Sequence, residues 1–278
     1  RSSSTASLLG ATKKSSGACR LDAPPVCLST PPSRLARKPG PVAPAMPEFQ
    51  SASLLLLGQA AVAMAVALFA LLRRPSEATP SFVLTALSAA WWSAAQAFHI
   101  SATNVGDRLF WGNATYWGIV SLPPAFLVFA LRLSGFGPAV SHAVVGALGV
   151  VPAVSLWALY TNETHHLFAL GPMAVFGSRG ENIWEPGPAF WVHTAYSYAC
   201  IGFALAILTR AVFAQSGVLS RQMALLLVSG AVPLVANAMR LAKVGTAGIS
   251  IDPTPFALLI SVALLPFALG RLRLLDIL

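Results

Sequence analysis

The chain contains 278 residues, of which 56% are hydrophobic and only 10% are charged, and its formal net charge is +9. Soluble domains carry about 25% charged residues and disordered chains are poorly hydrophobic, so this composition excludes both classes. Three cysteines are too few for a disulfide framework. The class that remains is an all-α membrane protein.

The first 45 residues differ from the rest of the chain. They hold seven basic residues and one acidic residue, which accounts for six of the nine net positive charges. They are rich in Ser and Pro and show no apolar periodicity, so we expect a disordered tail over 1–45 and a membrane domain over 46–278. Two interpretations of the tail stay open. It resembles an organellar transit peptide, or it is absent from the mature protein, because Met46 stands just before the first apolar run.

Seven apolar stretches follow, each close to the roughly 20 residues that a transmembrane helix needs. They cover residues 54–72, 82–100, 110–133, 140–160, 188–213, 222–241 and 253–270. We therefore predict a bundle of seven transmembrane helices. The basic tail is no sign of nucleic-acid binding, since that requires a basic patch on a folded surface.

The basic residues between these stretches predict the orientation. With the N-terminus outside, the inner loops hold seven of them, Arg73, Arg74, Arg132, Arg210, Arg221, Arg271 and Arg273. The outer loops hold four, Arg108, Arg179, Arg240 and Lys243. Cytoplasmic loops carry the excess of Lys and Arg, so we expect a plasma-membrane protein with its N-terminus outside and its C-terminus in the cytoplasm.

The one long loop lies between the fourth and fifth helices, at about 161–187, on the predicted outer face. It contains two short apolar runs around the turn Ser178-Arg179-Gly180-Glu181, a pattern typical of a β-hairpin. Long ordered loops are often lids or binding loops, and a simple cap over the bundle is the alternative.

Four of the five histidines gather at the same predicted face: His99, His165, His166 and His193. Neutral imidazole is a common metal ligand, but interfacial packing explains the rings as well, and we expect neither metal nor cofactor. A retinal protein needs a lysine within a helix to form a Schiff base. The only lysines are Lys13, Lys14, Lys38 and Lys243, which excludes an opsin-like photoreceptor.

Charged and polar side chains at the end of the sixth helix form a second candidate group. Asn237 and Arg240 are three residues apart and so share a helix face. Asp252 follows one short loop later. An Arg240–Asp252 ion pair would neutralise both charges near the outer surface; a role in ligand recognition is the alternative.

Several motifs from the third helix onward, in this order and spacing, resemble the N-terminal seven-transmembrane sensory region of bacterial histidine kinases. They are Leu122-Pro123-Pro124, Thr161-Asn162-Glu163-Thr164-His165-His166, Phe190-Trp191-Val192-His193, Tyr196-Ser197-Tyr198, Arg221-Gln222, Pro233 with Asn237, Asp252-Pro253-Thr254-Pro255, and Arg271-Leu272-Arg273-Leu274-Leu275-Asp276. The first two helices match in hydropathy alone.

The resemblance implies a sensory input module in the lipid bilayer that senses a small molecule or a membrane signal. We expect the ligand to contact His165, His166, Trp184, His193, Tyr196, Asn237, Arg240 and Asp252. The last helix would pass the signal through Arg271, Arg273 and Asp276 to a cytoplasmic signalling domain in cis or in trans. Histidine kinases work in pairs, so a homodimer is expected.

The chain holds no phosphoacceptor histidine after the bundle and no Gly-rich ATP-binding segment, so we expect no enzyme activity within it. A small transporter or channel is the main alternative function. That class needs a polar path through the bilayer, and the inner halves of the predicted helices are nearly free of ionisable groups. An intramembrane metalloenzyme that uses the outer histidines is a second alternative.

Overall fold

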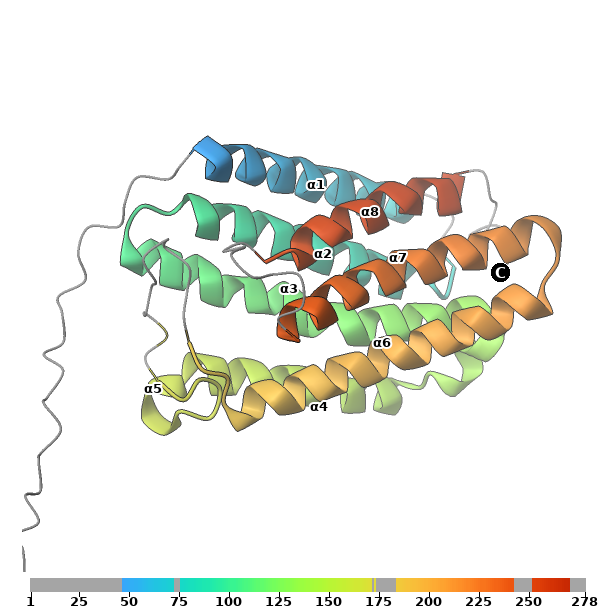
Figure 1. Cartoon of the computed structure of the whole chain (residues 1–278). Helices are drawn as coiled ribbons and strands as arrows, with labels where there is room; N and C mark the ends of the chain where they lie inside the picture. The colour runs from blue at the N-terminus through green and yellow to red at the C-terminus, as the bar shows by residue number, and fades with distance from the viewer. Residues whose placement is uncertain (1–46, 73–75, 172, 174–183, 243–251, 271–278) are drawn as a thin grey trace, which may run out of the picture. The chain divides into compact units, whose positions relative to one another are not determined.

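The structure is a computed structural model and describes residues 47–72, 76–171, 173, 184–242 and 252–270, without the side chains of 47–50 and 265–270. The regular elements among these residues are helical (Figure 1): α1 (Pro47–Leu72), α2 (Thr79–Ser101), α3 (Val105–Leu131), α4 (His142–Tyr160), α5 (Asn162–His165), α6 (Pro188–Ala214), α7 (Gly217–Leu241) and α8 (Thr254–Gly270). The predicted seven-helix bundle is confirmed, with α5 as one additional turn. The predicted tail lies outside the described residues.

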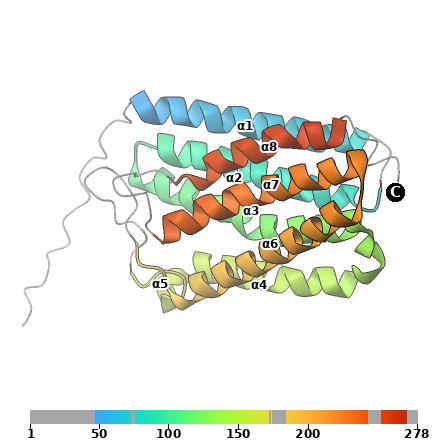
Figure 2. The same ribbon diagram turned by 45° about the vertical axis from the view of Figure 1, so that its right-hand side comes forward.

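Six of the long helices form a closed ring. Going round it, α1 contacts α2, α2 contacts α3, α3 contacts α6, α6 contacts α7, α7 contacts α8, and α8 returns to α1. Helix α4 packs outside the ring against α3 and α6, and Figures 1 and 2 place α1 and α4 at opposite edges of the bundle. The chain order therefore does not give the spatial order, because α6 takes the place beside α3 that α4 would have.

Five of the helices are long and apolar enough to cross a membrane: α1, α3, α4, α6 and α7. Helix α8 is a shorter apolar helix, counted over Thr254–Leu264. Helix α2 is not among these five, and more than half of its residues are buried. Its buried Ser88 and Ser93 donate to backbone carbonyls one turn earlier, which satisfies their hydroxyls inside the bundle.

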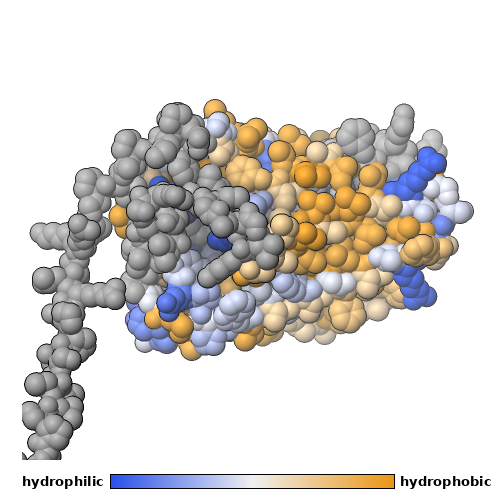
Figure 3. Space-filling view, viewed as in Figure 1, coloured by the Kyte–Doolittle hydropathy of each residue, from blue (hydrophilic) through white to orange (hydrophobic). Residues whose placement is uncertain are grey.

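The surface of the bundle is apolar over its middle. Figure 3 shows a hydrophobic band between two more polar ends. Large side chains exposed on it include Leu68, Val150, Val192 and Phe203, which are 55%, 56%, 62% and 68% exposed. Patches of this kind mark contact with lipid or protein, and helices hydrophobic on all sides are typical of membrane spans.

The two ends of the bundle differ in charge. At one end, here called the arginine end, Arg132 donates to the Glu77 carbonyl oxygen at 3.0 Å and Arg210 lies 5.7 Å from the centre of the Phe136 ring. Arg221, in the first turns of α7, belongs to this end as well. The other end, here called the loop end, holds α5, the end of α7 and the start of α8.

Two prolines inside helices release backbone carbonyls that neighbouring helices then bind. Proline has no N–H, so it leaves the carbonyl four residues earlier without its intrahelical partner. Pro233 releases the Ser229 oxygen, and Ser261 of α8 donates its hydroxyl to that oxygen at 2.6 Å. Pro152 of α4 releases the Leu148 oxygen in the same way. Such re-satisfaction by a neighbour is how proline is tolerated within a membrane.

Candidate functional site

The ring encloses a cavity of about 790 Å³ that extends from the loop end to Phe82 and Phe129, toward the arginine end. Its walls come from α2, α3, α6, α7 and α8 and from the chain just before α6, and its described lining includes no residue of α1 or α4. Toward the arginine end, buried side chains pack into the largest apolar cluster of the bundle. Phe82 and Phe129 belong to both the cluster and the cavity wall, so they form its floor.

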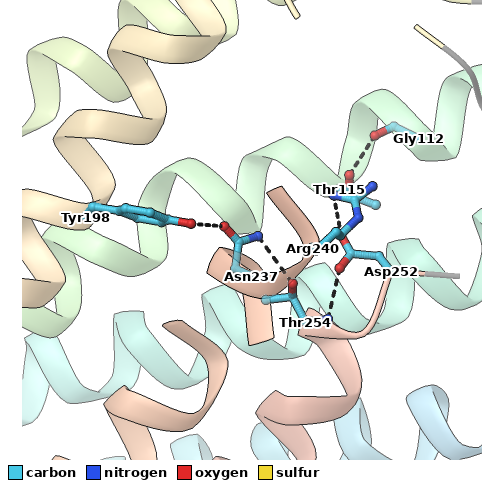
Figure 4. A network of polar contacts seen from close by, with 7 residues as sticks. All are labelled: Gly112, Thr115, Tyr198, Asn237, Arg240, Asp252 and Thr254. Carbon is cyan, nitrogen blue, oxygen red and sulfur yellow. Dashed lines mark hydrogen bonds and ion pairs between the residues drawn. The ribbon is translucent and has the colours of Figure 1, made fainter. Parts of the chain in front are cut away.

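A chain of hydrogen bonds joins α6, α7 and α8 along one wall of the cavity (Figure 4). Tyr198 donates its hydroxyl to Asn237 Oδ1 at 2.8 Å, and Asn237 Nδ2 donates to Thr254 Oγ1 at 3.2 Å. The Thr254 amide donates to Asp252 Oδ1 at 2.9 Å, which caps the start of α8. Thr254 is buried, and Tyr198, Asn237 and Asp252 are half-buried. These hydrogen bonds couple α8 to α6 and α7.

The predicted ion pair between Arg240 and Asp252 is present. Arg240 NH1 lies 3.1 Å from Asp252 Oδ2, and the two side chains are 47% and 16% exposed. Because both charges line the cavity at its loop end, the pair neutralises them there. An exposed pair of this kind contributes about 0–1 kcal/mol to stability, so its main consequence is the electrical neutrality of the wall.

His193 is the most deeply buried titratable side chain of the cavity wall. It is 3% exposed, and its Nε2 atom lies 3.4 Å from the Ser197 hydroxyl. Its Nδ1 atom has no hydrogen-bond partner among the described residues. Buried polar atoms are nearly always paired, so this atom lacks a partner that a group bound beside His193 could supply.

Aromatic side chains close the cavity beside the long loop. Trp184 and Phe190 line it, and each packs against Phe168, which is fully buried. The backbone pairs Leu170 with Glu185 and Phe168 with Gly187, which forms an isolated antiparallel bridge between Ala169 and Pro186. The turn of the predicted β-hairpin lies outside the described residues, and those on either side form this bridge rather than strands.

Five of the eight predicted ligand-contacting residues share the cavity: Trp184, His193, Asn237, Arg240 and Asp252. The other three lie elsewhere. His165 bonds Thr161 Oγ1 and the Leu167 amide. The exposed His166 ends α5 in a left-handed conformation with φ of 53°. Tyr196 donates at 2.6 Å to the Leu148 oxygen that Pro152 released, so it ties α6 to α4 outside the ring. The predicted output residues Arg271, Arg273 and Asp276 lie outside the described residues.

Several polar side chains of the wall were not predicted from the sequence. They are Gln96, His99, Asn113, Thr115, Tyr198, Ser229, Thr254 and Ser261. Gln96 and His99 are three residues apart on α2 and so share a face, a spacing that would have placed them together. Tyr198 and Thr254 stand in motifs of the family resemblance, whereas the remaining residues carried no such signal, because isolated Ser, Thr and Asn occur throughout apolar helices.

The histidines of the loop end do not converge. Within the part of the chain that the structure describes, no three His, Cys, Asp or Glu residues lie close enough to hold a metal ion together. Hydrogen bonds instead fix two of these rings separately. His99 Nδ1 lies 2.8 Å from the Arg108 carbonyl oxygen, and His165 uses both ring nitrogens for Thr161 and the Leu167 amide.

Comparison with known families gives one match. The sequence model described as the N-terminal 7TM region of histidine kinase matches residues 55–278, which is most of the chain. No curated protein and no solved structure matches this chain.

Proposed function

We infer the function of this protein from its family, because the chain belongs to the N-terminal seven-transmembrane regions of histidine kinases. It is a membrane-embedded sensory input module of that family. Beyond this, we propose that a ligand enters the cavity at the loop end and that α8 carries the response to a cytoplasmic signalling domain, in cis or in trans. We further propose that phosphoryl transfer belongs to that domain and that the module works as a homodimer.

The observation that carries this proposal is the place of α8 in the cavity wall. Helix α8 supplies Thr254, Leu258, Ser261 and Val262 to the lining, together with residues of four other helices. A ligand shifts an equilibrium only by binding two arrangements with different affinity. An occupant of this cavity contacts the last helix directly, so any change in how α8 packs changes the contacts of the ligand.

The charge distribution supports an orientation with the loop end outside. The arginine end carries Arg132, Arg210 and Arg221 with the acidic Glu77, whereas Arg108 and Arg240 at the loop end are accompanied by the acidic Asp107, Glu163, Glu185 and Asp252. Cytoplasmic ends carry the excess of basic residues. We propose that α8 therefore runs from the outer face into the cytoplasm, where a signalling domain can receive it.

The packed core at the arginine end argues against the alternative of a transporter or channel. Leu208, Met223 and Leu226 are at most 2% exposed and fill the ring there with Phe82 and Phe129. Solute passage requires a polar path through this region. Flux of a fluorescent solute or of protons into proteoliposomes would favour the transporter, and we expect none above protein-free liposomes.

A cavity-filling substitution tests the sensory function in the protein together with its kinase domain. Ala89 lies in the wall on α2 and is 5% exposed, so Ala89→Phe places an aromatic ring in the cavity. We expect the steady-state phosphorylation of the kinase domain to change by about fivefold or more, the lower end of allosteric couplings. The matched control is Ala147→Phe on the exposed face of α4, which should leave it unchanged. Equal phosphorylation in all three proteins would contradict the proposal.

A further inference from the structure

We propose that the cavity binds an uncharged amphiphile, with one hydroxyl or carbonyl head near His193 and an apolar body that extends toward the floor. This inference rests on the proposed function, since it names the chemical class of the ligand for the same site. It depends on three properties of the described walls: their length and apolarity, the buried imidazole, and the absence of uncompensated charge.

The length and apolarity of the cavity indicate the body of the ligand. Phe82 and His99 both line it, and they are 17 residues apart on α2, which corresponds to about 25 Å along the helix. The volume of about 790 Å³ lies within the range of small-molecule sites. The deeper walls are apolar, with Ala86, Phe126 and Val262 among them. A long apolar chain or ring system fits this space.

The buried imidazole indicates the head of the ligand. His193 Nδ1 has no partner among the described residues, and the residue is only 3% exposed. Depending on the tautomer, a neutral imidazole nitrogen donates or accepts one hydrogen bond. A hydroxyl group serves either tautomer and a carbonyl serves one of them, so a small neutral head can satisfy this atom.

The charges of the wall exclude an ionised head. Among the described lining residues, Arg240 and Asp252 neutralise each other at 3.1 Å, and Glu185 is exposed at the rim. The remaining polar groups of the lining are hydroxyls, amides, three indoles and the two imidazoles. A charge brought from water into such a site is strongly disfavoured unless a counter-charge meets it. Neutral ligands avoid that penalty.

Photolabelling with three matched competitors tests the ligand class. The probe is hexadecan-1-ol with a mid-chain diazirine, added to the protein in nanodiscs, and cross-links are mapped by mass spectrometry. Labelling of cavity peptides is normalised to labelling of the exposed face of α4, which corrects for partition into the bilayer. We expect unlabelled hexadecan-1-ol to compete at the cavity about tenfold better than hexadecyl sulfate or hexadecyltrimethylammonium.

Two variants locate the binding site. His193→Phe keeps the ring but removes the hydrogen bond, so labelling by the alcohol probe should fall about tenfold, and His193→Asn should recover part of it. Ala89→Phe should abolish cavity labelling, whereas Ala147→Phe should not. Two results with the wild-type protein would each overturn the proposal, whatever the variants show. One is that either charged amphiphile competes as well as hexadecan-1-ol or better. The other is that the probe labels only the lipid-facing surface.

The binding measurement is independent of signalling, so the two proposals fail separately. If phosphorylation responds to Ala89→Phe but the alcohol does not label the cavity, the sensory function stands and the ligand class is wrong. If the alcohol labels the cavity but phosphorylation is indifferent to Ala89→Phe, the cavity binds an amphiphile without serving as the sensor.

Discussion

At the scale of single residues, prolines decide where neighbouring helices are tied together. A proline inside a helix leaves one carbonyl unpaired at a known place, four residues before it. In this bundle Ser261 and Tyr196 donate to the carbonyls released by Pro233 and Pro152. Tyr196 therefore has a structural explanation that its position in the sequence did not indicate, since only the fold places its hydroxyl next to α4.

A double-mutant cycle tests the tie between α7 and α8. Ser261→Ala leaves the Ser229 oxygen without a partner in a buried place, which should lower the free energy of unfolding by about 1–3 kcal/mol. In the background Pro233→Ala, the new backbone N–H takes that oxygen, so Ser261→Ala should have little effect. The measurement is thermal unfolding in detergent. Equal losses in both backgrounds would show that the hydroxyl has another role.

Asn162 provides a second test at this scale. Its Oδ1 accepts from the Phe168 and Ala169 amides at 2.8 and 2.9 Å, and its Nδ2 donates to the Ala169 oxygen at 3.1 Å. Asn162→Ala leaves these fully buried groups unpaired and should lower the free energy of unfolding by about 2 kcal/mol or more. Thermal unfolding should show no comparable loss for Glu163→Ala, an exposed neighbour.

At the scale of helices, the shape of the ring depends on how closely α2 and α3 approach. Gly118 of α3 faces the α2 backbone, and a Cβ atom there would lie 2.5 Å from the Ser88 carbonyl oxygen and 2.8 Å from the Trp92 Cβ. Small residues permit such contact between membrane helices. The Trp91 indole also donates to the Ala114 oxygen at 2.7 Å, which fixes the same pair of helices.

Substitution of this glycine should separate the two helices. Gly118→Ala has no flexible neighbour that can yield, since the nearest atoms include backbone, and we expect a loss of about 1–3 kcal/mol in stability. The matched control is Gly146→Ala on α4, where nothing lies within 4 Å of the added atom. Unfolding temperatures of the two variants check this, and an equal effect in both would mean that α2 and α3 can move apart without loss.

At the scale of the whole molecule, the separation of charge between the two ends predicts its orientation. In a background without the native cysteines, Thr164→Cys at the loop end and Ser216→Cys at the arginine end place thiols at exposed positions. A membrane-impermeant maleimide should label the first in intact cells and the second only after permeabilisation. The reverse pattern would invert the proposed orientation. Labelling of both cysteines from the same side would contradict a bundle in which successive long helices cross the membrane in opposite directions.

The sequence by itself determined the seven long helices, although the starts of α1, α3 and α7 lie five to seven residues before the predicted ones. Bilayer thickness sets the length of a span, so the predicted stretch at 188–213 and the observed helix Pro188–Ala214 differ by one residue. The Arg240–Asp252 pair could be predicted because a short loop separates its partners. Family membership was likewise visible in the order of the motifs.

Only the tertiary structure decided which helices are neighbours and which polar groups meet. Helices that are apolar on every side carry no signal for the face that meets a neighbour, so the exclusion of α4 from the ring could not be predicted. The loop-end histidines also lie apart, with His193 in the cavity wall and His165 in α5, the turn that follows α4. Hydropathy reports transfer into lipid, whereas the cavity depends on the packing of side chains within the ring.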